Sequence, residues 1–363
     1  MASEKKMVKI ATEPRYYEKF GVLPGAVALH EDGVHNDGRA GSYEWWYLDG
    51  HFDDGSNLVI TFQNKFFVRP ELPLTPLVSF DLNRPNGEKI SKIYVGGPEE
   101  YSSSDMQCDV AIGKNRFKGD LSTYKIHIEV EDVTADVTLK GIVPAWRPGA
   151  GRILYGAEEQ YEYGWIVGVP KGEVWAEVTC NGKKETYHGY GYHDHNWGDR
   201  SLLDLKHHGY WGRAEVDGYT FINAINYAPE EFGKEPFTVF MLAHHGCIIA
   251  DDSAKVTFTQ SDEFTDPETG KVIARKICYL YDDGGKKYRF SYEVKDIIYR
   301  LKVLEILPEE QRRKTMEKGL IAPAYLRFAG TVELEIMDGD EVIEKHSGKA
   351  LWESMYFGNC EDF

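Results

Sequence analysis

Short runs of aromatic and β-branched residues, separated by glycine-containing turns, recur about every 8 to 12 positions along this chain. Tyr43–Phe52 and Leu58–Phe67 are one such pair, with the turn Asp53–Gly55 between them. The composition agrees, because aromatic residues make up 13% of the 363 residues and glycine contributes 36. We therefore predict an all-β protein built from antiparallel β-barrels or β-sandwiches.

A second hairpin resembles the first and suggests two related domains. His208–Tyr227 again has aromatic, alternating strands around an Asp-Gly turn, and its Gly218 follows Gly55 by 163 positions. Because that spacing is close to half of the ordered chain, we predict two consecutive domains with a tight interface that could form a ligand pocket. The predicted parts are an N-terminal arm at residues 1–40, a first domain at residues 41–203 and a second domain at residues 204–363.

Helical signals are concentrated near the C-terminus. Pro308–Lys318 begins with proline, has acidic residues in its first turn and is followed by Gly319. We predict one helix there and a single helical turn at Leu202–Leu205. The apolar segment Ile297–Ile306, just before the helix, is predicted as a strand.

The charge and the cysteines limit the partners and the compartment. The net charge is -17, so nucleic-acid phosphates and anionic membrane surfaces repel the chain on average. The five cysteines include no Cys-x-x-Cys pair, which fits reduced thiols. There is no signal-peptide core and no run of 18 apolar residues. We predict a cytoplasmic protein that binds no nucleic acid and does not insert stably into membranes.

The segment Tyr187–Asp199 concentrates the polar chemistry of the chain, with His-Asp-His-Asn-Trp in five consecutive positions. Alternating glycine and tyrosine residues before these positions indicate a strand. In a strand His193, His195 and Trp197 share one face and Asp194 lies on the other. The two histidines and the tryptophan could therefore line the wall of a pocket.

Three interpretations of this segment are open. It could be a buried polar group whose histidines bond to carbonyl oxygens. It could hold a metal ion, although no zinc-type spacing accompanies it. It could also be an acid–base or substrate-orienting site, for which a histidine beside a carboxylate is suited near neutral pH. We expect the third interpretation, with no metal and no cofactor.

Two motifs carry a resemblance to a known family: Glu44–Tyr47, which reads Glu-Trp-Trp-Tyr before an Asp-Gly turn, and Gly191–Gly198. With them the chain resembles the carotenoid 1,2-hydratase (hydroxyneurosporene synthase) and AttH-like family of paired lipocalin-like domains, related in fold to fungal Diels-Alderases. The resemblance covers about residues 40–360. It implies two consecutive lipocalin-like antiparallel domains with a largely apolar ligand site between or within them.

The resemblance also implies two kinds of activity, water addition to an isoprenoid double bond and cyclisation of polyene chains. Hydration needs a proton donor and a stabilised carbocation, for which Trp46, His195 and Trp197 are the matching positions. The hydratase branch is thought to use an acid on the hairpin after the His-Asn-Trp motif, where this chain has Asn223 and Asn226. Because asparagine cannot deliver the first proton, we favour cyclisation or isomerisation.

The leading hypothesis is a cofactor-free cyclase or isomerase that holds the reactive ends of a long apolar polyene, polyketide or isoprenoid substrate together. The alternatives are a hydratase with Glu44 or Asp194 as the acid, and a lipocalin-like carrier without chemistry. We expect His195→Ala to lose activity while the fold survives. The predicted catalytic residues are His195, Glu44, Asp194 and Asn226. The predicted substrate-binding residues are Trp45, Trp46, Tyr47, His193, Trp197, Asn223, Tyr227 and Trp352.

Overall fold

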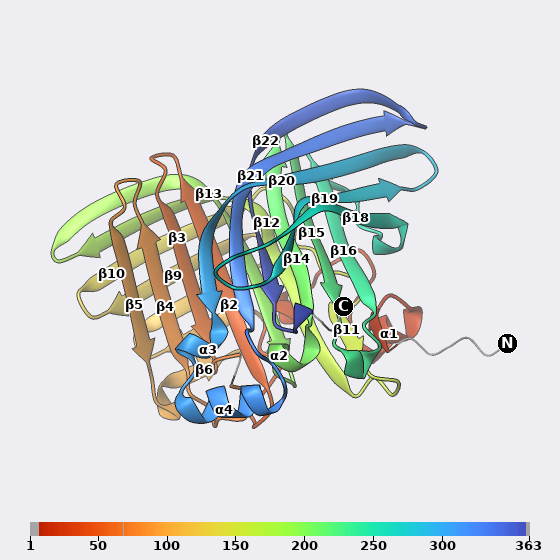
Figure 1. The fold of residues 1–363 in the computed structure, drawn as a ribbon. Helices are drawn as coiled ribbons and strands as arrows, with labels where there is room; N and C mark the ends of the chain where they lie inside the picture. The colour runs from red at the N-terminus through yellow and green to blue at the C-terminus, as the bar shows by residue number, and fades with distance from the viewer. Residues whose placement is uncertain (1–6, 68, 361–363) are drawn as a thin grey trace. The chain divides into compact units, whose positions relative to one another are not determined.

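The fold is known from a computed structural model that describes residues 7–67 and 69–360. The chain divides into two compact units. The first unit is Lys9–Leu202, and the second begins at Leu203 and also includes Val8. Each unit is organised around one large sheet whose paired strands are antiparallel, so the all-β prediction is confirmed (Figure 1).

The first unit is built on a 13-stranded sheet with the path β5-β4-β3-β2-β13-β12-β10-β9-β8-β7-β6, from which β11 pairs with β12 and β1 pairs with β11. β13 carries the His-Asp-His-Asn-Trp segment and lies in the middle, between β2 and β12. The elements are β1 (Val8–Ile10), α1 (Pro14–Phe20), η1 (Leu29–Asp32), β2 (Tyr43–Phe52), β3 (Asn57–Gln63), β4 (Leu77–Asn83), β5 (Lys89–Val95), η2 (Pro98–Glu100), β6 (Tyr101–Ser103), β7 (Asp109–Ile112), β8 (Asn115–Gly119), β9 (Thr123–Val130), β10 (Val133–Gly141), β11 (Arg152–Tyr155), β12 (Tyr161–Cys180) and β13 (Lys183–Gly198).

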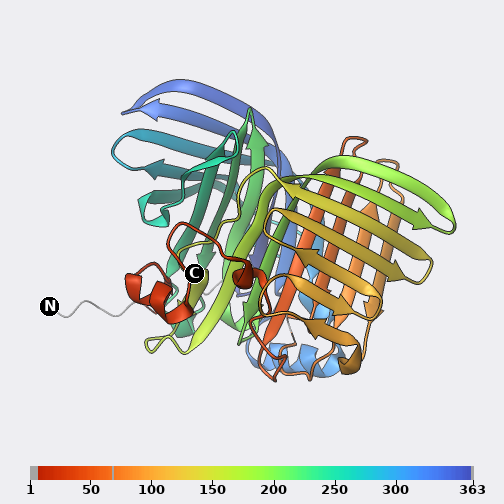
Figure 2. The same cartoon turned by 180° about the vertical axis from the view of Figure 1, so that it is seen from behind.

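The sheet of the first unit curls around one hydrophobic core. Leu48, Phe80, Ile126 and Leu139 come from strands spread along the sheet, yet they belong to one buried cluster. Seen from behind, the gold strands of residues 109–141 lie across this core from the orange strands of residues 43–95 (Figure 2). Alternate positions along β9 are buried, the period-2 pattern of a strand with one face on a core.

The second unit is built on a nine-stranded sheet with the order β17-β16-β15-β14-β22-β21-β20-β19-β18. Its own core is rich in aromatic residues, including Phe221, Tyr279, Phe290 and Trp352. The elements are α2 (Leu202–Leu205), β14 (His208–Val216), β15 (Tyr219–Tyr227), η3 (Glu230–Phe232), β16 (Pro236–His244), β17 (Cys247–Ala250), η4 (Ser253–Lys255), β18 (Val256–Thr265), β19 (Val272–Asp282), β20 (Lys286–Lys302), α3 (Val303–Ile306), α4 (Glu309–Glu317), β21 (Ala324–Asp338) and β22 (Glu341–Tyr356).

Two of the helices were predicted from the sequence, and two were not. α4 and α2 confirm the predicted C-terminal helix and the helical turn. The predicted strand at Ile297–Ile306 is wrong in its last four residues, which form α3 because the pairing of β20 with β21 ends at Lys302 and Ala324. α1 was not predicted, although Pro14 at its start and left-handed Gly21 at its end are ordinary helix signals. Within the described chain, no helix is long and apolar enough to cross a membrane.

Candidate functional site

The central strand β13 sorts the predicted site residues of the first unit onto two faces of the sheet. His193 packs on Phe117 and Tyr124 of the core, and His195 lies on the same face two positions later. Asp194 lies on the opposite face. We call these the core face and the outer face.

His195 lies between two carboxylates on the core face. Its Nε2 is 2.8 Å from Glu44 Oε1, and its Nδ1 is 3.3 Å from Asp32 Oδ1, in an ion-pair contact that is not aligned as a hydrogen bond. The imidazole stacks on Trp46 with ring centroids 4.3 Å apart. His195 and Glu44 are completely buried. Because each ring nitrogen faces an acceptor oxygen, the geometry fits a doubly protonated imidazolium over an indole face.

His193 is held in a similar way. Its Nδ1 donates to the Tyr47 carbonyl oxygen at 2.8 Å, and its Nε2 is 3.2 Å from Asp32 Oδ2. The Tyr124 hydroxyl donates to the same Asp32 oxygen at 2.5 Å. His193, Asp32, His195 and Glu44 therefore form a buried chain in which histidines and carboxylates alternate, and we call it the acid–histidine row.

The charges in the row support one another. Burial would raise the pKa of Asp32, but the charges of His193 and His195 and the hydrogen bond from His193 outweigh burial and hold that pKa well below its usual range. Burial would lower the pKa of His195, but the contacts with Asp32 and Glu44 raise it. Burial raises the pKa of Glu44, although His195 and the backbone N–H groups of His35 and Asn36 oppose the increase.

The N-terminal segment supplies Asp32 and His35, which the sequence did not identify as site residues. Glu31 anchors this segment through a buried ion pair with Arg147, whose guanidinium also donates to the carbonyl oxygens of Leu23 and Ala26. Asp32 precedes a glycine, and that dipeptide gives only a turn signal in the sequence. Its role depends on contacts with residues 92 or more positions away, which no local pattern encodes.

Trp197 closes the core face beside the row. His35 stacks on its indole with centroids 3.6 Å apart, and the Arg152 guanidinium lies 4.3 Å from the ring centroid. Gly164, directly across from Trp197 in β12, makes room for the indole, because a Cβ atom there would lie 1.8 Å from a ring atom. The tryptophan is therefore a packed wall of the core.

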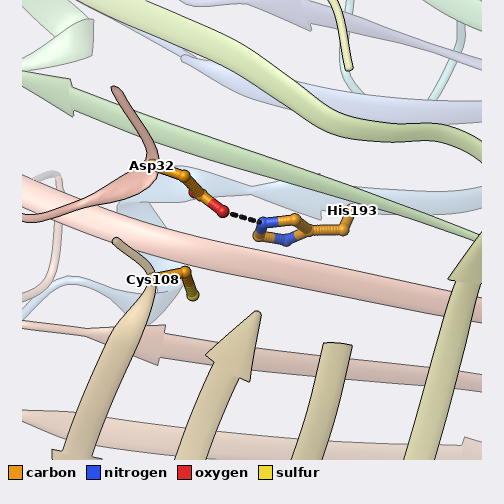
Figure 3. A group of neighbouring side chains, drawn as sticks. All are labelled: Asp32, Cys108 and His193. Atoms are coloured by element: carbon orange, nitrogen blue, oxygen red, sulfur yellow. Dashed lines mark hydrogen bonds and ion pairs between the residues drawn. The ribbon is translucent and has the colours of Figure 1, made fainter. Parts of the chain in front are cut away.

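Asp32, Cys108 and His193 each offer one atom of a kind that binds metals, and these atoms lie within 4.8 Å of one another. Figure 3 shows the Asp32 carboxylate pointing at the His193 ring, with the Cys108 sulfur to one side. The Asp32 oxygen that faces His193 also accepts from Tyr124, and burial raises the pKa of the Cys108 thiol well above its usual value. We interpret the group as a set of hydrogen-bonded side chains beside a buried, packed thiol.

The outer face carries Asp194 in a ring of donors. Its Oδ2 accepts from Trp165 Nε1 at 3.0 Å and from the Tyr192 hydroxyl at 2.8 Å, and its Oδ1 accepts from Asn196 Nδ2 at 2.9 Å. Burial raises the pKa of Asp194 to about 6, and these hydrogen bonds together with the charge of His193 limit the increase. A carboxyl group with this pKa can accept or donate a proton near neutral pH.

Aromatic residues surround this carboxyl group. Trp45 and Tyr47 follow the same alternation on β2 and face Asn196 and Asp194 across the ladder. The Tyr163 hydroxyl donates to Asn196 Oδ1 at 2.6 Å, which fixes the amide that bonds Asp194. Asn196 was part of the sequence motif but not of the predicted site residues, and its position beside Asp194 at i, i+2 is the signal that could have identified it.

The four predicted site residues of the second half lie in the second unit. Trp352 and Asn223 lie on either side of Gly212 in the sheet, and Asn223 Oδ1 accepts from the Tyr292 hydroxyl at 3.0 Å. Within the described residues, Asn223 Nδ2 and Trp352 Nε1 have no hydrogen-bond partner. Asn226 is buried, and Tyr227 stacks on His208 with centroids 4.4 Å apart.

Two hollows mark the surface of the first unit. One, of about 730 Å³, is lined by residues that include Arg84, Glu185 and Tyr187, and the other, of about 610 Å³, by residues that include Tyr94 and Glu100. Among the described residues, none of the predicted site residues lines either hollow. The site residues are thus separate from both surface hollows.

Comparison with protein families gives a match over more than half of the chain. Residues 102–303 match the family described as Diels-Alderase-like. A curated relative, hydroxyneurosporene dehydrogenase of Chlorobaculum tepidum, is 26% identical over 348 residues, which cover 85% of this chain and 81% of the relative. These matches confirm the family resemblance that the two sequence motifs predict.

Solved structures share the fold at low sequence identity. CghA with Sch210972 superposes with a TM-score of 0.60 at 13% identity and covers 87% of this chain and 89% of that chain. Kievitone hydratase from Nectria haematococca superposes with a TM-score of 0.55 at 14% identity and covers 98% of each chain. The architecture of both units is therefore a known one.

Proposed function

The chain belongs to the Diels-Alderase-like family, and on that basis we propose that it is a cofactor-free enzyme that cyclises or isomerises a long apolar polyene, polyketide or isoprenoid substrate. The observation that carries the proposal is the outer face of β2, β12 and β13. There a carboxyl group with a pKa of about 6 lies among aromatic side chains.

The aromatic side chains suit a folded apolar chain. The ring centroid of Trp45 lies 6.5 Å from that of Tyr163 and 5.2 Å from that of Phe67. Tyr47 packs edge-on against Tyr192. Such surfaces bind unsaturated hydrocarbons by contact and keep the two reacting ends close. Holding the ends in a reactive geometry lowers the entropic part of the barrier, by up to about 7–11 kcal/mol in the most favourable intramolecular reactions.

Asp194 is the group that we propose touches the reacting part of the substrate. In its protonated form it can donate a hydrogen bond to a substrate carbonyl, which makes a neighbouring double bond more electrophilic. Tyr192, Trp165 and Asn196 keep the carboxyl group oriented. His195 and Glu44 lie on the core face, so we propose that they act through the β13 backbone.

The test uses Asp194→Asn, which keeps the shape of the side chain and removes its ability to titrate. We expect at least a tenfold loss of kcat on a linear polyene that the wild-type protein cyclises. Asp136→Asn, at an exposed position of β10, is the matched control and should leave kcat unchanged. Full turnover by Asp194→Asn would contradict the proposed site.

A second candidate function is hydration of an activated double bond. It is favoured by the pKa of Asp194, because this carboxyl group can supply the proton that the two asparagines of the second unit cannot. The structural similarity to kievitone hydratase is compatible with it. Turnover in H₂¹⁸O separates the two functions, since hydration places labelled oxygen in the product and cyclisation does not.

A further inference from the structure

We propose that Asp32 is a positioning residue for the outer-face site. Its carboxylate contacts both His193 and His195, the two residues that flank Asp194 in β13. Asp32 thereby fixes the strand on both sides of the carboxyl group that faces the substrate. This proposal rests on the proposed function, because it gives Asp32 a role in presenting Asp194.

Asp32 is itself held at both its backbone and its side chain. Its carbonyl oxygen accepts from Trp46 Nε1 at 3.2 Å, which ties η1 to β2. Its carboxylate is 1% exposed and accepts from Tyr124 of β9. The titratable groups that face Asp32 among the described residues include His193 and His195 of β13, Tyr124 of β9, Cys108, which precedes β7, and His35 of its own segment.

Charge balance explains why both histidine rings depend on Asp32. His193 faces the Tyr47 carbonyl and Asp32, and His195 faces Asp32 and Glu44, so each of the four ring nitrogens faces an acceptor oxygen. Asp32 supplies a counter-charge for an imidazolium at His195, and a buried core tolerates a charge only when it is paired. Without the charge of Asp32 the pKa of His195 should fall, because one counter-charge less then opposes the effect of burial.

The acid–histidine row is linked to the outer face through adjacent residues of β13. Adjacent residues of a strand point to opposite faces, so a rotation of the backbone that carries His193 or His195 also reorients Asp194. The charge of His193 is one of the causes that limit the rise in the pKa of Asp194. Groups that orient the ligands of metal sites are commonly worth about 10- to 100-fold in activity, and we expect an effect within that range for a residue that orients Asp194.

The experiment compares wild type with Asp32→Asn and with Asp37→Asn, a control in the same segment whose side chain is exposed. Ring ¹⁵N signals of the full-length protein are recorded at pH 7.5, above the ordinary histidine pKa of about 6.5. We expect an imidazolium signal for His195 in wild type and in Asp37→Asn, because the contacts with Asp32 and Glu44 raise its pKa. In Asp32→Asn this ring should become neutral, and kcat should fall about tenfold with little change in KM.

Two outcomes overturn the proposal. A neutral His195 ring in wild type at pH 7.5 would remove its premise, and this measurement does not depend on whether Asp32→Asn folds. Unchanged ring signals and unchanged kcat in Asp32→Asn would show that Asp32 does not position the strand that carries Asp194. Failure of the proposed function is a separate result, since it appears as full turnover by Asp194→Asn whatever the histidine spectra show.

Discussion

His195 Nε2 lies 2.8 Å from Glu44 Oε1, and neither side chain has any exposed surface. The pair joins β13 to β2 on the core face, while Asp194 and Tyr47 face each other across the same two strands on the outer face. A motif that reads as one site in the sequence is therefore two connected structures. One is a buried charged row, and the other is a carboxyl group among aromatic rings.

Replacing His195 with alanine should destabilise the fold. The change leaves Asp32 and Glu44 buried without the cation between them, and breaking a buried ion pair costs about 3–5 kcal/mol. Urea unfolding would measure the loss. His127→Ala, which breaks only the surface pair with Asp136, should cost less than about 1 kcal/mol. Equal stability of the two variants would contradict the buried acid–histidine row.

The stability of the protein should depend on pH in two opposite ways. The pKa of Asp32 is lowered in the folded state, so its contribution is present above its unfolded pKa of about 3.9 and is lost as the pH falls. The pKa of His195 is raised, so its contribution is complete below about 6.5 and is lost as the pH rises through the folded pKa. The contributions of Asp32 and His195 are thus both complete only between about pH 4 and 6.5, and their sum should decline on both sides of that range. If His195→Gln no longer shows the fall in denaturation midpoint at high pH, that fall is due to His195.

Asp194 should add a third dependence on pH. Its folded pKa of about 6 exceeds its unfolded value, so folding favours the protonated form, and stability is lost as the pH rises from about 4 to about 6. Asp194→Asn should remove this part of the pH profile. Denaturant titrations of both proteins at several pH values in that interval provide the measurement, and identical slopes would contradict the raised pKa.

Trp165→Phe should shift the pH dependence of activity. The indole donates to Asp194 at 3.0 Å, and that hydrogen bond favours the charged carboxylate. Without it the pKa of Asp194 rises further, so the limb of the pH–rate profile due to this group should move to higher pH. Trp146→Phe is the control, because Trp146 packs edge-on against Trp165, and it is the Trp165 indole that donates to Asp194. The same shift in both variants would point to packing as the cause.

Arg147→Met should loosen the segment that carries Asp32. Arg147 pairs with buried Glu31 and donates to the carbonyl oxygens of Leu23 and Ala26. Its loss leaves the Glu31 carboxylate buried without a cation. Hydrogen exchange of residues 23–36 should become faster, while exchange in β9 stays slow. The double variant Glu31→Gln, Arg147→Met should recover part of the protection, and a uniform change across the first unit would instead indicate global destabilisation.

Local sequence patterns predict most of the strands, the turns and the two faces of the central strand. Period-2 alternation places His193 and His195 opposite Asp194 in any extended backbone, and Asp-Gly and Asn-Gly turns mark the hairpins because few other dipeptides adopt their backbone angles. Two sequence motifs were enough to predict the family, since they combine unusual residues at fixed spacing.

Which side chains contact one another depends on the three-dimensional packing of the chain. Asp32 joins His193 and His195 across a separation of more than 160 positions, and Arg147 anchors Glu31 across 116. Such contacts depend on how the sheet curls around its core, which is a property of all its strands together and leaves no local pattern. Whether a histidine is a solvent-facing base or a buried cation follows from that packing, because burial and neighbouring charges set its protonation.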